Sequence, residues 1–306
     1  CSQKQTSGEN ESDKNNNWLD TVNNIQYYIS IIGSSISIVC YICIIATFLI
    51  YTELQNLPGM NTIALCCSLL IADISFIIGV ENRSNSNICK TFAIILHWSL
   101  LLVAVWLTII AFDLMIRFSK VKPIPKGRHL KQFFKYCILA LSLPTMIIMI
   151  NIALDQSDSV AIRYGDHNKC WINSFDAYLV SFMVPIAFCY LLTITTLSYT
   201  IHKLYFTTKS NAKVLSENGK VKLDILKIAL KLSCVLGIIE GIGFVQIHGD
   251  NLTENQLIFN SVFGTIYTIF RSLRGLILLL VYIIKKDIFA LYKKSLKIKA
   301  SVESNA

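Results

Sequence analysis

The sequence predicts an all-α membrane protein, built as a seven-transmembrane helix bundle with a short amphipathic helix after the seventh span. The first observation is composition: of 306 residues, 54% are hydrophobic and only 15% are charged, whereas soluble domains are about one quarter charged. The second is that apolar runs of about 20 residues, enough to cross a hydrocarbon core as a helix, recur along the chain. The third is that lysine and arginine gather between these runs, as they do in cytoplasmic loops.

Seven apolar runs qualify as spans, and they are unbroken rather than alternating every second residue, which argues against a transmembrane barrel. In chain order, they cover residues 25–51, 61–80, 89–118, 132–154, 175–199, 223–247 and 256–284. The fourth and fifth contain Pro144 and Pro185, and kinks are tolerated inside transmembrane helices.

Polar segments flank the spans at both ends of the chain. Residues 1–24 are rich in asparagine, and we expect them to form a disordered extracellular segment. Residues 285–306 begin KKDIFALYKKSLKIKA, and we expect a cytoplasmic tail with an amphipathic helix whose lysines meet anionic membrane lipids.

Basic residues set the orientation, because positive charge marks the cytoplasmic side. Three segments after the third, fifth and seventh spans are rich in such residues: Lys120, Lys122, Lys126, Arg128, Lys131; Lys203, Lys209, Lys213, Lys220, Lys222; and Lys285, Lys286, Lys293, Lys294, Lys297, Lys299. The opposite side carries only Lys4, Lys14, Arg83, Arg163 and Lys169. The amino terminus is therefore predicted to lie outside, in a multi-pass protein of the plasma membrane, although the first cytoplasmic loop, TELQNLPGM, has no basic residue.

Two further signals agree with this orientation. The N-x-S/T glycosylation sequences at Asn10, Asn82 and Asn251 all fall in segments placed outside. Cys89 begins the third span on the outer side, and Cys170 lies in the second outer loop. In an oxidising compartment we expect these two cysteines to pair and fix that loop over the bundle mouth. Two free thiols are the alternative.

Seven helices, an outer amino terminus and such a disulfide describe a G-protein-coupled receptor. Four stretches carry a closer resemblance: ELQNLPGMNTIALCCSLLIADISFIIG, CKTFAIILHWSLLLVAVWLTIIAFD, the Cys170-Trp171 pair and YTIFRSLRGLILLLVYIIKKDIFALYKK. They resemble the Methuselah-like and adhesion receptors of the secretin-like superfamily (class B), and the ending WLTIIAFD is closer to the Methuselah-like group. The resemblance implies a receptor domain, residues 25–284, that binds an extracellular ligand of unknown identity and activates heterotrimeric G proteins.

The chain also departs from related patterns. It lacks the Asp-Arg-Tyr and Asn-Pro-x-x-Tyr motifs of rhodopsin-like receptors, which supports the secretin-type assignment. Glu240 stands where the superfamily usually has tryptophan, and Arg271-Ser-Leu-Arg274-Gly stands where it usually reads Asn-Ser-Leu-Gln-Gly. These substitutions bear on how its activation switch would work here.

Asp73, Glu240, Arg271 and Arg274 lie well inside the predicted spans, and a lone charge at the bilayer centre costs a few kcal/mol or more. At about 1.5 Å per residue, Asp73 lies about 18 Å from the cytoplasmic end of its span, and Arg274 and Arg271 lie about 15 Å and about 20 Å from that end of theirs. Asp73 can therefore pair with either arginine, and Arg271 is the nearest partner for Glu240. This intramembrane polar network either repacks when the sixth helix moves or is a fixed structural element.

Asp113 ends the run WLTIIAFD, about 8 Å from the cytoplasmic end of the third span. Because the related receptors place a carboxylate here, Asp113 is a switch candidate that would bond to the second or sixth span and hold the inactive state. The alternative is an interfacial carboxylate that pairs locally with Arg117 at i,i+4. The candidate docking residues for the G protein are Arg117, Lys120, Lys122, Lys126, Arg128, Lys220 and Lys222.

Four aromatic residues lie near the outer half or the centre of the bundle. His97, Trp98 and Trp106 on the third span, with Trp171 in the second outer loop, are interpreted either as packing residues or as part of a ligand pocket.

Other functional classes have less support. The sequence has no metal-ligand cluster, cofactor motif, phosphate loop or nucleophile–base pair that would indicate an enzyme, and its basic residues follow membrane loops rather than a nucleic-acid site. A repeat transporter should show similarity between its halves, and we see none. A retinal protein needs a lysine within the seventh span, whereas Lys285 lies at its edge. A seven-span transporter, or an adhesion protein without G-protein signalling, is the alternative.

Overall fold

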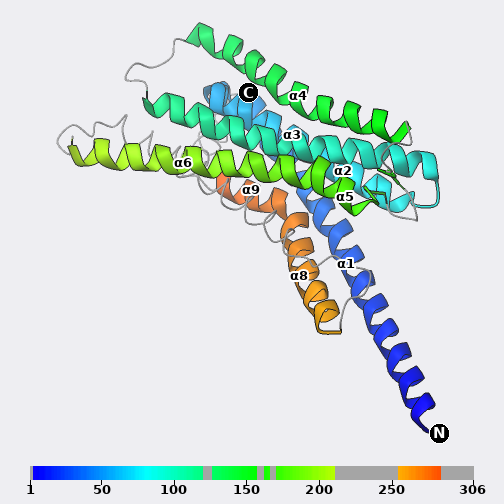
Figure 1. Cartoon of the computed structure of the whole chain (residues 1–306). Helices are drawn as coiled ribbons and strands as arrows, with labels where there is room; N and C mark the ends of the chain where they lie inside the picture. Colours follow the sequence, from blue (N-terminus) through cyan, green and yellow to red (C-terminus); the bar gives the residue numbers. More distant parts are fainter. Residues whose placement is uncertain (1–2, 120–125, 157–161, 166–169, 211–253, 284–306) are drawn as a thin grey trace, which may run out of the picture.

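The computed structural model describes residues 3–119, 126–156, 162–165, 170–210 and 254–283, and these residues are almost entirely helical (Figure 1). The long helices are α1 (Gln3–Ile50), α2 (Leu57–Glu81), α3 (Ser86–Ser119), α4 (Lys126–Gln156), α6 (Val184–Ser210), α8 (Glu254–Ser272) and α9 (Arg274–Ile283). Shorter elements are the 3-10 turn η1 (Thr52–Leu54), α5 (Phe175–Tyr178) and the π-helical turn η2 (Leu179–Met183). The described residues form no strand, only an isolated antiparallel bridge between Tyr164 and Ile172.

Five helical segments are long and apolar enough to cross a membrane: Asp20–Ile50, Leu57–Glu81, Ser86–Arg117, His129–Gln156 and Phe175–Lys203. A sixth is obtained when the bent pair Gln256–Ser272 and Arg274–Tyr282 counts as one span. These six match the predicted first to fifth spans and the seventh. The predicted sixth span, residues 223–247, and the tail, residues 285–306, lie outside the described residues.

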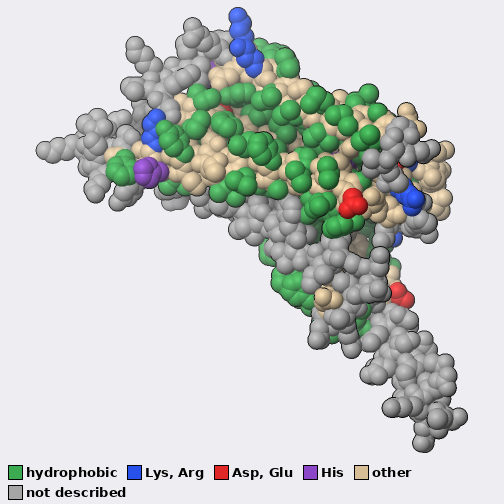
Figure 2. Space-filling model, viewed as in Figure 1, with side chains coloured by type: hydrophobic (Ala, Val, Ile, Leu, Met, Phe, Trp, Pro, Cys, Tyr) green, Lys and Arg blue, Asp and Glu red, His purple; other side chains and the backbone are tan. Residues whose placement is uncertain are grey.

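The outward faces of the helices are apolar, which suits lipid rather than water as the solvent. Large aliphatic and aromatic side chains on α1, α4 and α6 are exposed, and Figure 2 shows hydrophobic side chains over much of one face of the bundle. In water, a patch of this extent would be an association site, whereas in a bilayer it is the normal surface of a spanning helix.

Helix α3 forms the centre of the bundle. It packs against α2, α4 and α6, and 78% of its most apolar stretch is buried, against 22–44% for the other four unbroken spans. The polar side chains His97, Ser99, Thr108 and Asp113 of α3 are consequently buried against other helices rather than exposed to lipid, which is where membrane proteins keep such groups.

Helix α1 begins at Gln3, so it takes in most of the segment, residues 1–24, that we expected to be disordered. No proline occurs before Pro58 to interrupt the helix, and its amino-terminal end extends beyond the bundle (Figure 1). The extracellular placement of this end stays a prediction.

The predicted seventh span is not one straight helix. It breaks at Leu273, where α8 and α9 meet at a bend of 46°. The hydroxyl of Ser37 on α1 donates to the carbonyl oxygen of Ser272 at 2.5 Å and accepts from the amide of Gly275 at 3.0 Å. A Cβ atom at Gly275 would lie 2.5 Å from the Cα of Ser37. Glycine thus allows α1 to approach closely enough to satisfy the backbone groups that the break exposes.

Candidate functional site

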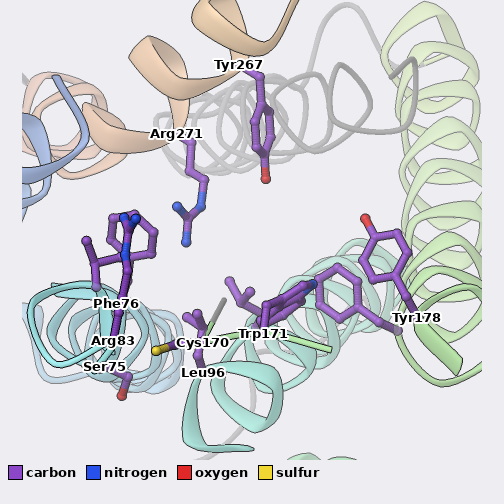
Figure 3. A pocket seen from close by; sticks show the side chains of 12 residues that line it. Ser75, Phe76, Arg83, Leu96, Cys170, Trp171, Tyr178, Tyr267 and Arg271 are labelled. Carbon is purple, nitrogen blue, oxygen red and sulfur yellow. The ribbon is translucent and has the colours of Figure 1, made fainter. Parts of the chain in front are cut away.

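A cavity of about 370 Å³ lies between α2, α3, α8 and the second loop, at the end of the bundle that carries the disulfide (Figure 3). We call this end the disulfide end. The wall combines aromatic rings with two arginines, and its residues are Ser75, Phe76, Val80, Arg83, Leu96, Leu100, Cys170, Trp171, Tyr178, Phe182, Tyr267 and Arg271.

The second loop is fixed over this cavity by a covalent bond and a short backbone pairing. The predicted disulfide between Cys89 and Cys170 is present, and it joins the start of α3 to the loop with a Cα–Cα distance of 4.9 Å. Beside it, the amide of Gly165 donates to the carbonyl oxygen of Trp171 at 3.0 Å. Trp171 is thereby held at the cavity wall, with its ring centroid 5.0 Å from that of Phe182.

His97 is buried behind this wall and connects four segments through a chain of hydrogen bonds. Pro185 has no N–H to donate to the carbonyl of Ser181, four residues earlier, and His97 Nε2 lies 3.2 Å from that oxygen. Because a carbonyl only accepts, Nε2 is the protonated nitrogen, and Nδ1 accepts from the hydroxyl of Tyr164 at 2.8 Å. Asn151 donates in turn to the Tyr164 oxygen at 3.4 Å. Burial raises the pKa of Tyr164 to about 12, which keeps its hydroxyl a donor.

The other aromatic candidates are separated by the structure. Trp98 donates from Nε1 to the hydroxyl of Thr145 on α4 at 3.1 Å. Trp106 is buried in the core and stacks on Phe133, with centroids 6.1 Å apart. Of the four aromatic candidates, only Trp171 lines the cavity.

Arg271 and Arg274 have different surroundings although they are three residues apart. Arg274 is fully buried and donates from Nη2 to Asp73 Oδ1 at 3.0 Å, with side-chain exposures of 0% and 1%. The hydroxyl of Tyr41 is buried and has no hydrogen-bond partner among the described residues. Arg271 lies over the ring of Phe76 instead, 4.4 Å from its centroid, and points into the cavity (Figure 3).

Of the two partners that the sequence leaves open for Asp73, the structure therefore has Arg274. Glu240, the partner that we expected for Arg271, lies outside the described residues. The break at Leu273 separates the two arginines, so that one belongs to the buried core and the other to the cavity.

Asp113 lies at the opposite end of the bundle and is buried, with 2% of its surface exposed. It accepts from Arg117 Nε at 2.7 Å and from the hydroxyl of Tyr136 on α4 at 3.2 Å. We had placed this carboxylate at the interface or in contact with the second or sixth span. The local ion pair is present, but α4 supplies the second donor, because α3 lies at the bundle centre with α4 against it.

Asp113 also lines a smaller cavity of about 120 Å³, together with Asn61 and Thr62 of α2 and Tyr282 of α9. Thr62 donates to the Tyr282 hydroxyl at 3.2 Å. The side-chain amide of Asn61 is buried and has no hydrogen-bond partner within the described part of the chain. The wall also includes apolar side chains such as Phe48, Ile110 and Leu114, and its few polar groups are suited to hold water between the helices.

The remaining predicted residues fall at the ends of helices or outside the structure. Asn82 follows α2, and its side-chain amide donates to the carbonyl of Ile78 at 2.9 Å. Asn10 lies on α1, and Lys126 and Arg128 lie in the first turn of α4. The residues outside the described ranges are Lys120, Lys122, Lys220, Lys222 and Asn251. No group of three or more metal-ligating side chains occurs among the residues described.

Comparison with known proteins agrees with this geometry. The family model for the 7 transmembrane receptor (Secretin family) matches residues 23–278. Adhesion G protein-coupled receptor E1 of Mus musculus is 29% identical over 92% of this chain, and E2 of Rattus norvegicus is 27% identical over 92%. Adhesion G protein-coupled receptor L4 of Danio rerio is 25% identical over 78%. The chain spans 29%, 29% and 32% of these relatives' own lengths. The chain belongs to the secretin family of seven-transmembrane receptors, and it is similar to adhesion G protein-coupled receptors.

Proposed function

We propose that this chain takes an extracellular ligand into the cavity at the disulfide end and activates a heterotrimeric G protein at the opposite end. The observation that carries the proposal is the cavity itself, roofed by Cys170 and Trp171 and walled by three helices of a receptor-family bundle. Pockets between helices of a bundle, apolar with a few convergent polar groups, are the usual form of a ligand site.

The proposed orientation places the disulfide end and the amino terminus outside the plasma membrane. Its support is the distribution of basic residues, which follow the third, fifth and seventh predicted spans, together with the disulfide, which forms in oxidising compartments. The ends of α3 and α4 that carry Arg117, Lys126 and Arg128 then face the cytoplasm and contribute to the docking surface.

In the proposed mechanism, the ligand shifts the population between inactive and active bundles, which it does only by binding the active bundle more tightly. Asp113 contributes to the inactive arrangement because its buried carboxylate joins α3 to α4 through Tyr136. The small cavity beside it, which includes Tyr282 of α9, gives this end room to rearrange. Loss of the Asp113 charge would weaken the inactive arrangement and raise signalling without ligand.

The test is agonist-free activation of a panel of Gα proteins by the whole chain in cells, with Asp113→Asn compared at equal surface expression. We expect coupling to one class of Gα and higher basal activity in the variant. Lys90→Gln serves as the matched control, since it removes an ion pair with Asp155 at the disulfide end (2.9 Å). Silence of both chains at the surface would contradict the role proposed for Asp113. It would leave a ligand-dependent receptor, or a transporter or adhesion protein, and solute-uptake assays would separate them.

A further inference from the structure

We infer that the cavity at the disulfide end binds a small organic acid, whose carboxylate pairs with Arg271 and whose apolar body packs among the aromatic side chains. This ligand class rests on the receptor function proposed above, and adds to it the chemistry that the cavity recognises.

The described wall of the cavity carries basic side chains and no acidic ones. The basic residues are Arg83 and Arg271. The acids nearest in the sequence have other partners: Asp73 accepts from Arg274 at 3.0 Å, and Glu81 accepts from the hydroxyl of Tyr27 at 2.7 Å. Arg83 lies over the ring of Tyr27, 5.7 Å from its centroid, so the Glu81 carboxylate bonded to Tyr27 is a counter-charge near it. Arg271 has no acidic partner among the described residues, and an anion in the cavity would balance its charge.

The position of Arg271 suits a carboxylate. Its guanidinium carbon lies over the Phe76 ring, 4.4 Å from the centroid, in a cation–π contact that uses none of the N–H donors in a hydrogen bond. The N–H donors lie in the plane and point outward, so stacking leaves them able to bind a carboxylate through two parallel hydrogen bonds. Because Arg271 belongs to a membrane-crossing segment, an anion in the cavity also offsets the cost of keeping this charge away from water.

The rest of the wall sets the shape and size of the ligand. Trp171, Tyr178 and Phe182 form a continuous aromatic group, with centroids 5.0 Å apart for Trp171–Phe182 and 5.5 Å apart for Tyr178–Phe182. The volume of about 370 Å³ falls at the low end of the range of roughly 300–1,000 Å³ that small-molecule sites occupy. An acid with one aromatic or short aliphatic body fits this space, and a folded partner does not.

Purified whole chain in lipid nanodiscs provides the test. The probes are phenylacetic, 3-phenylpropionic, 4-phenylbutyric and 1-naphthylacetic acid, each compared with its own primary amide, which has the same body without the charge. We expect at least one acid to raise the melting temperature more than its amide. Arg271→Gln should weaken the binding of that acid by about 10- to 100-fold, the range for one charge-assisted contact, and leave the amide unchanged.

Arg163→Gln is the matched control, because it removes an exposed arginine of the second loop that does not line the cavity. Should Arg271→Gln fail to fold, Arg271→Lys keeps the charge but loses the two parallel N–H donors, and it should weaken binding of the acid and leave the amide unchanged. A panel in which no acid exceeds its amide overturns the inference, as does an acid preference that survives the Arg271 substitution. Acid binding that requires Glu240→Gln would assign Arg271 to Glu240 and also overturn it.

This measurement reads ligand binding without a G protein. Failure of acid binding with active Gα coupling would reject the ligand class alone, whereas acid binding without coupling would reject the signalling function alone.

Discussion

Removing one partner of the Asp73–Arg274 ion pair should lower the free energy of unfolding more than replacing both partners by neutral residues. Both side chains are buried, with exposures of 1% and 0%, and the N–O distance is 3.0 Å. Asp73→Asn or Arg274→Gln alone would leave one buried charge without its counter-ion, which costs about 3–5 kcal/mol of unfolding free energy. The double substitution leaves two neutral amides that hydrogen-bond to each other, so it should lie within about 2 kcal/mol of the wild type.

The assay is reversible unfolding in SDS mixed micelles, followed by circular dichroism, for the wild type, both single variants and the double variant. A coupling energy above about 3 kcal/mol is expected from the cycle. Arg163→Gln, which removes an exposed loop arginine, should change stability by less than about 0.5 kcal/mol. If the loss of unfolding free energy in the double variant equals the sum of the two single losses, the two charges do not stabilise each other and the reasoning is refuted.

Three further substitutions test the packing that shapes the cavity. His97→Phe leaves a buried carbonyl and a buried phenol without their partner, and should lower unfolding free energy by about 1–3 kcal/mol in the same SDS titration. Cys89→Ser opens the disulfide that spans 81 residues, and should destabilise by about 2–4 kcal/mol, whereas the exposed free thiol variant Cys43→Ser should match the wild type. Gly275→Ala places a Cβ 2.5 Å from the backbone of α1 and should reduce the folded yield on size-exclusion chromatography. Gly79→Ala, whose Cβ would have its nearest atom at 3.3 Å, should not reduce it. Equal yields would contradict this account of the α1–α9 contact.

The six spans that the structure describes and the disulfide were predictable because they depend on signals that are local or chemical. Hydropathy summed over about 20 residues is what a bilayer selects, and Cys89 and Cys170 stood apart from the cysteines inside apolar runs. The cavity was not predictable to the same degree. Phe76, Phe182 and Tyr267 lie in apolar runs among many similar residues, and only packing decides which of them faces inward.

The same limit explains Asp73 and Asp113. In a straight seventh helix, Arg271 and Arg274 would lie on neighbouring faces, and either would reach Asp73. The break at Leu273 depends on a hydroxyl from Ser37 on α1, more than 230 residues away in the chain. For Asp113, the contact with Tyr136 depends on how α4 packs on α3, which no spacing in the sequence records.

The bend at Leu273 also divides the seventh span into two arms, α8 and α9, that can change their relative angle. Arg271 lies on the α8 arm, and Arg274 lies on the α9 arm, where Asp73 holds it. Two bonds of the helical ladder pass through the pivot, from the amide of Leu273 to Ile269 and from the amide of Ile277 to Leu273. The Ser37 hydroxyl pairs with two further backbone groups beside it, so the arms are joined there by few bonds. A ligand that binds Arg271 would displace α8, whereas the buried ion pair with Asp73 would keep α9 in place. Ligand binding at the cavity would therefore change the angle between the two helices at Leu273.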